Sequence, residues 1–167
     1  MARAKRLPVP PRTDTSSLVE AWGAPIDGAL LSLALVHRSY ANEAGGIANN
    51  ERLEFLGDSV LSVVIAERLF HDYPDVAESD LSRMRAATVS QAPLAAAARR
   101  IGLGDYVYLG KGESLHGGRD KDSILSDTVE ALIGATYLTH GLEPTRVVVE
   151  RLVSRFLAQA RTRGAGL

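Results

Sequence analysis

The sequence predicts an all-α fold, and two observations lead to this prediction. Apolar residues recur at helical spacing from Ser17 onward, without the alternation that is typical of strands. Ala, Leu, Glu and Arg dominate where strands would carry Val, Ile, Thr and aromatic residues. The expected helices cover Ser17–Trp22, Gly28–His37, Asn49–Asp72, Glu78–Ile101, Ile124–His140 and Glu143–Arg161.

The two ends of the chain are expected to lie outside one helical domain. Residues 1–16 combine basic residues with prolines, a composition that cannot bury much apolar surface and therefore predicts a disordered basic tail. Residues 17–162 form the expected domain, because 167 residues with 46% hydrophobic residues are enough for one core. Residues 163–167 indicate the start of a flexible linker.

Composition excludes several classes of protein. The chain has no Cys, so disulfide frameworks, thiolate zinc sites and cysteine nucleophiles are ruled out, which fits a reducing cytoplasm. We expect no membrane partner, since no apolar run is long enough to span a bilayer. The formal net charge of −1 does not by itself indicate a nucleic-acid-binding protein, so such binding would depend on where the charges lie.

A glycine-rich segment precedes the fifth expected helix. Gly102–Lys121 contains six glycines but lacks the Gly-Lys-Ser/Thr ending of a phosphate-binding P-loop. We therefore expect a surface loop close to a functional site, in which Tyr106, Val107 and Tyr108 are able to pack down.

Three acidic residues follow one another on the third expected helix. At 100° per residue, the side chains of Glu51, Glu54 and Asp58 lie within about 60° of arc. Neither Arg52 nor Arg68 is placed to pair with them along the helix. Two carboxylates about 4 Å apart repel by about 4 kcal/mol at an effective dielectric constant of about 20, so the stripe calls for a cation.

The rest of this helix is apolar on almost every side, as Leu53, Phe55 and Val63 illustrate. Such a helix is typically buried, so we expect the acidic stripe to be turned away from open solvent. One small domain cannot cover all of this apolar surface, which predicts a homodimer.

A second acidic pair, Asp127 and Glu130, lies at i and i+3 on the fifth expected helix. Gly134 on the same helix would let the two acidic helices approach closely. Oxygen donors without soft ligands favour Mg²⁺, with Mn²⁺ as a substitute. The four histidines have no di-iron spacing, and no Gly-x-Ser-x-Gly elbow is present. His37 is the one histidine placed to contact a substrate or simply to bond locally.

The run Asn50–Leu61, with the sequence NERLEFLGDSVL, closely resembles the signature helix of ribonuclease III. Further segments that resemble this family are Leu35–Tyr40, Gly117–Asp127 and Thr128–Ala135. The resemblance implies the helical bundle of a ribonuclease III endonuclease domain. By this resemblance Glu54, Asp127 and Glu130 would ligate magnesium, while Asp58 and Glu130 would act at the scissile phosphate.

The resemblance also implies positions at the substrate or dimer surface. Glu51 matches an acidic position of that surface, and Phe55 would pack into the partner. Glu78 matches an acidic position near the cleft, although Ser79 stands where the family usually has Gly. Candidate contacts to RNA phosphates are Arg38, Lys121, Lys111 and Arg119.

The activity implied is magnesium-dependent cleavage of double-stranded RNA by a homodimer. Each protomer would cut one strand and leave 5′-phosphates and short 3′ overhangs, in the processing of rRNA precursors, mRNA and tRNA in the cytoplasm. The family ordinarily continues into a double-stranded-RNA-binding domain, which is absent from these 167 residues.

Two other hypotheses remain open. One is a catalytically silent scaffold of the same fold that binds RNA without cutting it. The other is an all-α nucleotide pyrophosphohydrolase, because Glu51-x-x-Glu54 and Asp127-x-x-Glu130 resemble its magnesium-binding pairs.

Overall fold

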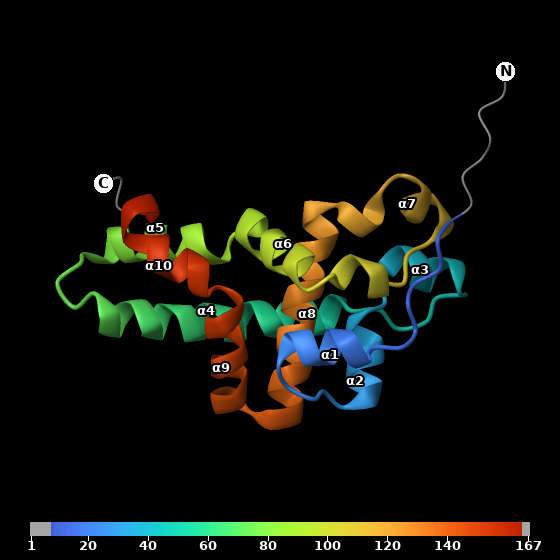
Figure 1. Ribbon diagram of the computed structural model, residues 1–167, viewed down its shortest axis with the longest axis horizontal. Helices are drawn as coiled ribbons and strands as arrows, with labels where there is room; N and C mark the ends of the chain where they lie inside the picture. Colours follow the sequence, from blue (N-terminus) through green and yellow to red (C-terminus); the bar gives the residue numbers. More distant parts are fainter. Residues whose placement is uncertain (1–7, 165–167) are drawn as a thin grey trace, which may run out of the picture.

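The computed structural model describes residues 8–164, which fold into ten α-helices and two short 3₁₀ helices (Figure 1). In chain order the elements are α1 (Ser16–Trp22), α2 (Gly28–Ala34), α3 (Arg38–Glu43), α4 (Glu51–Asp72), α5 (Glu78–Val89), α6 (Gln91–Arg100), η1 (Leu103–Tyr106), α7 (Lys111–Leu115), η2 (Gly118–Asp120), α8 (Asp122–His140), α9 (Leu142–Leu152) and α10 (Ser154–Gly164). Within the described residues the extended pairing is limited to one isolated parallel bridge between Val36 and Tyr108. The predicted all-α class is therefore confirmed.

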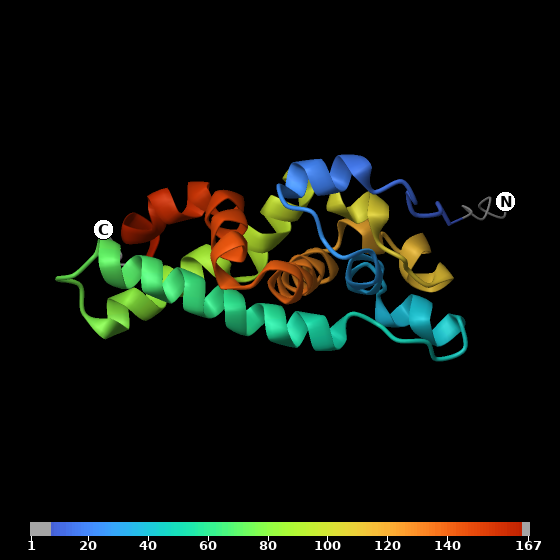
Figure 2. The ribbon, with the colours of Figure 1, turned by 90° about the horizontal axis from the view of Figure 1, so that it is seen from below.

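The two longest helices, α4 and α8, cross and make the most extensive contact between any two elements (Figure 1). Helix α4 runs along one long side of the molecule, and α1 lies on the opposite side (Figure 2). Helix α8 buries residues on all its faces, including Ile124, Val129 and Ile133. This central helix therefore carries the core, and α4 lies against it where the acidic residues are.

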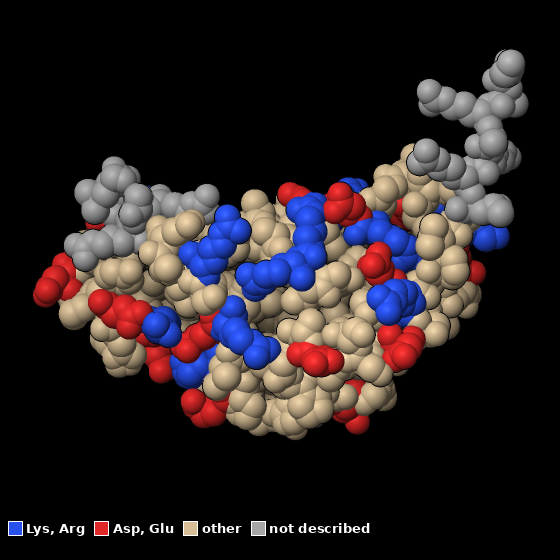
Figure 3. Space-filling model, viewed as in Figure 1, with Lys and Arg blue, Asp and Glu red and all other residues tan. Residues whose placement is uncertain are grey.

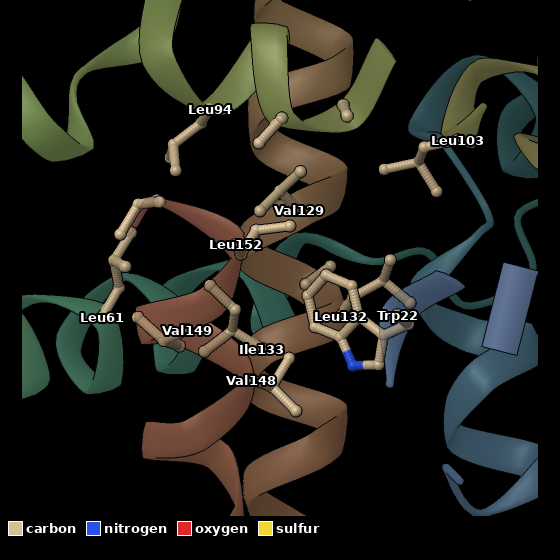
Figure 4. Close-up of a cluster of buried hydrophobic side chains, with 14 of the residues drawn as sticks. Trp22, Leu61, Leu94, Leu103, Val129, Leu132, Ile133, Val148, Val149 and Leu152 are labelled. Atoms are coloured by element: carbon tan, nitrogen blue, oxygen red, sulfur yellow. The ribbon is translucent and has the colours of Figure 1, made fainter. Parts of the chain in front are cut away.

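The core around α8 is apolar with few polar groups. Trp22 from α1 and Leu132 from α8 lie beside Val148 from α9 in Figure 4. The indole Nε1 of Trp22 donates to Thr136 Oγ1 at 2.9 Å, so the polar atom of this buried side chain is satisfied. This bond and the packing fix α1 against α8.

Two glycines bring the backbones of α4 and α8 into contact. A Cβ atom added at Gly57 would lie 1.6 Å from the carbonyl oxygen of Glu130, and one at Gly134 would lie 2.4 Å from that of Leu53. The close approach expected at Gly134 is thus present, and Gly57 is its counterpart on α4. The crossing places the acidic residues of the two helices side by side.

The helices expected at 17–22, 49–72 and 124–140 are confirmed with small changes at their ends. The helix expected over Gly28–His37 is wrong in its second part, because α2 ends at Ala34. The next residues pair with Tyr108, whose N–H donates to Leu35 O at 2.8 Å and whose carbonyl accepts from His37 N at 3.1 Å. His37 is then the N-cap of α3, a helix that the sequence did not predict.

The helix expected over Glu78–Ile101 is two helices that meet at Ser90, where the backbone is extended. Pro93 explains the break, since it has no N–H to donate to the carbonyl of Val89 and its ring would clash there. The helix expected over Glu143–Arg161 is also divided, at Val153.

No Pro or Gly causes that second break. Helix α10 turns away to pack against α5, so tertiary packing decides it. The carbonyl of Leu152, at the end of α9, accepts a hydrogen bond from Arg100 Nη2 at 2.6 Å.

The segment expected as a surface loop, 102–121, contains η1, α7 and η2. Leu103, Tyr106 and Val107 are each at most 3% exposed, so the first half of the segment packs into the core, as was expected for Tyr106 and Val107. The second half lies at the surface, because α7 has no buried residue. Residues 8–15 of the expected tail run along it, where Arg12 N donates to Asp105 O at 2.8 Å. Residues 1–7 of that tail, and 165–167 of the expected linker, lie outside the described residues.

None of the helices between residues 8 and 164 is both long and apolar enough to cross a membrane.

Candidate active site

The structure brings the predicted acidic residues together on the floor of one cavity of about 620 Å³. Helix α4 contributes Glu54 and Asp58, and α8 contributes Asp127 and Glu130. The backbone contact between the two helices at Gly57 sets this arrangement. Residues 73 positions apart in the chain, such as Glu54 and Asp127, therefore lie within hydrogen-bonding reach of each other.

The four carboxyl groups form two close pairs, Glu54 with Asp127 and Asp58 with Glu130. Burial and the neighbouring acids raise the pKa of Glu54 to about 7. Burial and the adjacent Asp58 raise the pKa of Glu130 to about 8. The pKa of Asp127 is also raised, chiefly by burial. At neutral pH the floor therefore holds protons that a cation of sufficient charge would displace.

The chemistry of the floor suits a hard divalent cation, because the four side chains offer only oxygen donors. As they stand, however, no three Asp, Glu, His or Cys side chains within residues 8–164 are arranged to hold an ion. Glu54, Asp127 and Glu130 are the residues that could hold such a cation, once their carboxyl groups leave the present pairs.

The expectation that the acidic stripe is turned away from solvent is only partly right. Glu54 is half-buried, whereas Glu51 and Asp58 are exposed. The helix was expected to be covered on every side, but the chain covers one side only. Phe55, Val63 and Phe70 remain 79%, 50% and 66% exposed on the uncovered side of α4.

Two of the predicted phosphate contacts, Arg38 and Lys121, line the wall of the cavity. Glu51 lines the cavity too, and sequence reasoning missed a sixth carboxylate there, Glu113, whose Oε1 lies 4.0 Å from Lys121 Nζ. The sequence pattern that could have indicated Glu113 is an acidic residue among the basic residues of the glycine-rich segment. His37 also lines the cavity, and its ring is half-buried.

Other predicted contacts lie elsewhere. Glu78 is exposed at the start of α5, where it accepts from Ser82 Oγ at 2.9 Å, and it does not line the cavity. Lys111 is exposed outside the cavity lining. Arg119 lies outside the cavity lining, and its guanidinium donates to the carbonyls of Val107 at 2.6 Å and Val9 at 2.8 Å. Arg119 instead attaches the N-terminal segment to the domain.

Figure 3 shows Lys and Arg side chains gathered over the middle of the face that carries α1 and α10. A smaller cavity of about 230 Å³ in the molecule is lined by Arg100 and Arg151. Each donates to the end of a helix, Arg100 to Leu152 O at 2.6 Å and Arg151 to Trp22 O at 2.9 Å. These arginines therefore have a structural role, because they satisfy carbonyl groups at helix C-termini.

The fold and the site define a class: an all-α domain in which two crossing helices present carboxylates to one open cavity. Residues 27–156 match the family model described as Ribonuclease-III-like, and the chain belongs to this family.

Among curated relatives, Ribonuclease 3 of Corynebacterium jeikeium is 52% identical over 153 residues, which cover 92% of this chain and 63% of that protein. Ribonuclease 3 of Mycobacterium tuberculosis is 53% identical over 153 residues, with 90% and 64% covered. The chain thus spans less than two thirds of the length of these relatives.

Solved structures show the same fold. The nuclease domain of ribonuclease III from Campylobacter jejuni matches with a TM-score of 0.81 at 40% identity, covering 87% of this chain and 99% of that one. That domain is described with a flexible region involved in dimer formation. Dicer from Pichia stipitis matches with a TM-score of 0.60 at 25% identity, covering 79% and 56%.

Proposed function

We propose that this chain is the nuclease domain of an endoribonuclease that hydrolyses phosphodiester bonds in double-stranded RNA. The convergence of four carboxylates from α4 and α8 on one cavity floor, in a chain of the ribonuclease-III-like family, carries the proposal. The wall residues Arg38 and Lys121 supply positive charge for RNA phosphates. Duplex RNA would be recognised by its shape, phosphates and 2′-hydroxyl groups.

In this proposal Glu54, Asp127 and Glu130 hold Mg²⁺, which Mn²⁺ can replace. The cation would offset charge on the reacting phosphate and lower the pKa of a bound water. Support comes from the donor set, which contains only carboxylate oxygens, and from the raised pKa values of these groups.

Asp58 and Glu130 act at the scissile phosphate. Asp58 is the exposed member of its pair, so its carboxylate can accept a hydrogen bond from the attacking water and orient it. Glu130 is more buried and is fixed by α8, so it holds the reacting group in place beside Asp58. Cleavage of each strand would leave a 5′-phosphate and a short 3′ overhang.

The functional unit would be a homodimer that pairs the uncovered sides of two α4 helices. The exposed stripe of Phe55, Val63 and Phe70 supports this, because apolar stripes of this kind mark protein interfaces. Glu51 lies beside Phe55 and would sit at the edge of the interface and the substrate. The cellular role proposed is the processing of rRNA precursors, mRNA and tRNA in the cytoplasm.

The test is cleavage of duplex RNA as a function of Mg²⁺ concentration, with melting temperature followed in parallel. Glu130→Gln should keep the fold and lower the cleavage rate by about 100- to 1,000-fold, as when one group that stabilises a transition state electrostatically is removed. Glu54→Gln and Asp127→Asn should recover in part with more Mg²⁺ or with Mn²⁺. Asp58→Asn should recover poorly, because its role is to orient water.

Glu20→Gln on α1, outside the cavity, is the matched control and should cut like the wild type. Near wild-type cutting by Glu130→Gln at low Mg²⁺ would contradict the assigned site. Binding of duplex RNA without any cleavage would identify a silent scaffold. Hydrolysis of nucleoside triphosphates in place of RNA would identify a pyrophosphohydrolase.

A further inference from the structure

His37 stands at the N-terminus of α3, in the wall of the cavity, and its backbone is held on both sides. Its N–H donates to Tyr108 O at 3.1 Å, and the carbonyl of the preceding Val36 accepts from Asn50 N at 2.9 Å. Asn50 is itself buried, with Nδ2 bonded to Ala34 O at 3.0 Å. The backbone that carries the imidazole ring is therefore held in a fixed position.

One nitrogen of the ring, Nδ1, acts as a hydrogen-bond acceptor in the fold, and this role determines whether it carries a proton. The backbone N–H of Ser39 donates to His37 Nδ1 at 3.1 Å, so the ring caps α3 as an acceptor. Ser39 Oγ lies 2.7 Å from the same Nδ1 and accepts from Gly110 N at 2.9 Å. The hydroxyl hydrogen of Ser39 is therefore free to point at Nδ1.

A proton on Nδ1 would face the N–H of Ser39 and break the cap. The neutral ring of His37 must then carry its hydrogen on Nε2, where it is a donor. Within residues 8–164 no hydrogen bond satisfies Nε2. The ring thus offers one donor, on the part that is not used for capping, in a side chain that lines the cavity.

The surroundings favour the uncharged ring. Burial lowers the pKa of His37, and the nearby Arg38 and Lys121 act in the same direction, while Glu113 and Asp127 oppose them. A charged imidazolium would compete with a cation for Asp127. A neutral ring near Asp127 does not compete with a cation in this way.

We infer that His37 Nε2–H donates a hydrogen bond to a phosphate oxygen of the bound RNA strand. The inference rests on the proposed function, since it names a further residue of the same cavity. A phosphate oxygen fits because it is an acceptor only, and because Arg38 and Lys121 place positive charge at the same wall. His37 is then both the cap of α3 and a contact to the substrate.

His37→Asn separates the two roles, because Asn is also a good N-cap but is too short to replace Nε2–H. We expect a melting temperature close to that of the wild type and single-turnover cleavage slower by about 10- to 100-fold, the usual effect of losing a hydrogen bond to a charged group. His37→Ala should lose stability as well. His140→Asn, which alters a histidine bonded to Pro25 O outside the cavity, is the matched control and should cut normally.

Duplexes with a single neutral methylphosphonate locate the contact. At one position the modification should slow the wild type but add little to the defect of His37→Asn. Equal effects on the two proteins at every position, or wild-type cutting by His37→Asn, would overturn the inference. If the wild type itself cuts no duplex RNA, the proposed function fails instead.

A measurement that needs no variant is the ring-nitrogen NMR spectrum of the wild-type chain without metal. We expect the signals of an Nε2–H tautomer for His37 near neutral pH. An Nδ1–H tautomer would overturn the inference, because Nε2 would then be an acceptor.

Discussion

Both sides of α4 carry large apolar side chains, but the rest of the chain covers only one of the two sides. One side buries Leu53, Gly57 and Val60 against the rest of the chain, and Gly57 touches the backbone of α8. The other side leaves Phe55 and Val63 exposed. The covered side is apolar throughout, whereas Phe55 and Val63 lie among exposed polar residues. Gly57 sets how closely α8 approaches the covered side, because it has no side chain.

The acidic residues lie where these two sides meet. Glu54 is half-buried beside the covered side, whereas Asp58 is exposed next to the uncovered side. One turn of α4 thus supplies both a partly desolvated carboxyl group, Glu54, that suits an ion and a solvated one, Asp58, that can reach substrate. The comparison between the sides can be tested by changing one feature of each.

The largest effect is expected from Gly57→Ala on the covered side. The new methyl group would meet the carbonyl oxygen of Glu130, which cannot move without shifting α8. We expect a loss of stability of about 3 kcal/mol, at the upper end of usual overpacking effects. Cleavage should fall by about 100-fold or more, the cost of moving reacting groups by about 1 Å.

Denaturant unfolding and duplex-RNA cleavage measure the two effects of Gly57→Ala. Gly28→Ala is its control, because a Cβ atom at Gly28 has no neighbour within 4 Å. A Gly57→Ala protein with unchanged stability would mean that α4 and α8 are not in backbone contact.

A smaller effect is expected from Phe55→Ala on the uncovered side. The side chain is 79% exposed, so the unfolding of the monomer should change little. If Phe55 crosses the dimer interface, its loss should weaken association by about 2 kcal/mol, or about 30-fold in Kd. Sedimentation over a range of concentrations measures this.

Leu138→Ala is the control for Phe55→Ala, since Leu138 is 53% exposed on α8. A wild-type chain that stays monomeric and still cuts duplex RNA would show that the uncovered side has another use.

The smallest expected effect is on the pH dependence of stability, and it concerns the acidic residues at the boundary between the covered and uncovered sides of α4. The pKa of Glu130 is raised to about 8 and that of Glu54 to about 7, above the ordinary value of 4.5. A raised pKa in the folded state gives stability that is full below the unfolded pKa and is lost as pH rises through the folded pKa. The melting temperature of the metal-free chain should therefore fall between about pH 4.5 and pH 8.

Glu130→Gln should flatten this dependence and melt above the wild type at pH 8.5, whereas Glu20→Gln should follow the wild type. Thermal melts in a chelator at several pH values make the comparison. Equal slopes for Glu130→Gln and wild type would mean that Glu130 ionises freely.

Much of the site was predictable because it depends on local periodicity. Glu54 and Asp58 are one turn apart, as are Asp127 and Glu130, so each pair shares a face whatever surrounds it. Gly134 indicated the close approach of the helices. Glu113 and the position of His37 were not predictable, since the segment that carries Glu113 is ordered by distant contacts such as Tyr108 with Leu35.

The sequence by itself determined the all-α class, the long helices and the acidic pairs, because helical spacing and residue propensity act over a few residues. Only the tertiary structure decided where helices break without a proline, as at Val153, and that the chain leaves Phe55 and Val63 of α4 uncovered. It also decided that Arg119 is used inside the domain and that His37 caps α3 at the cavity wall. These outcomes depend on contacts between residues far apart in the chain, whose geometry no local pattern encodes.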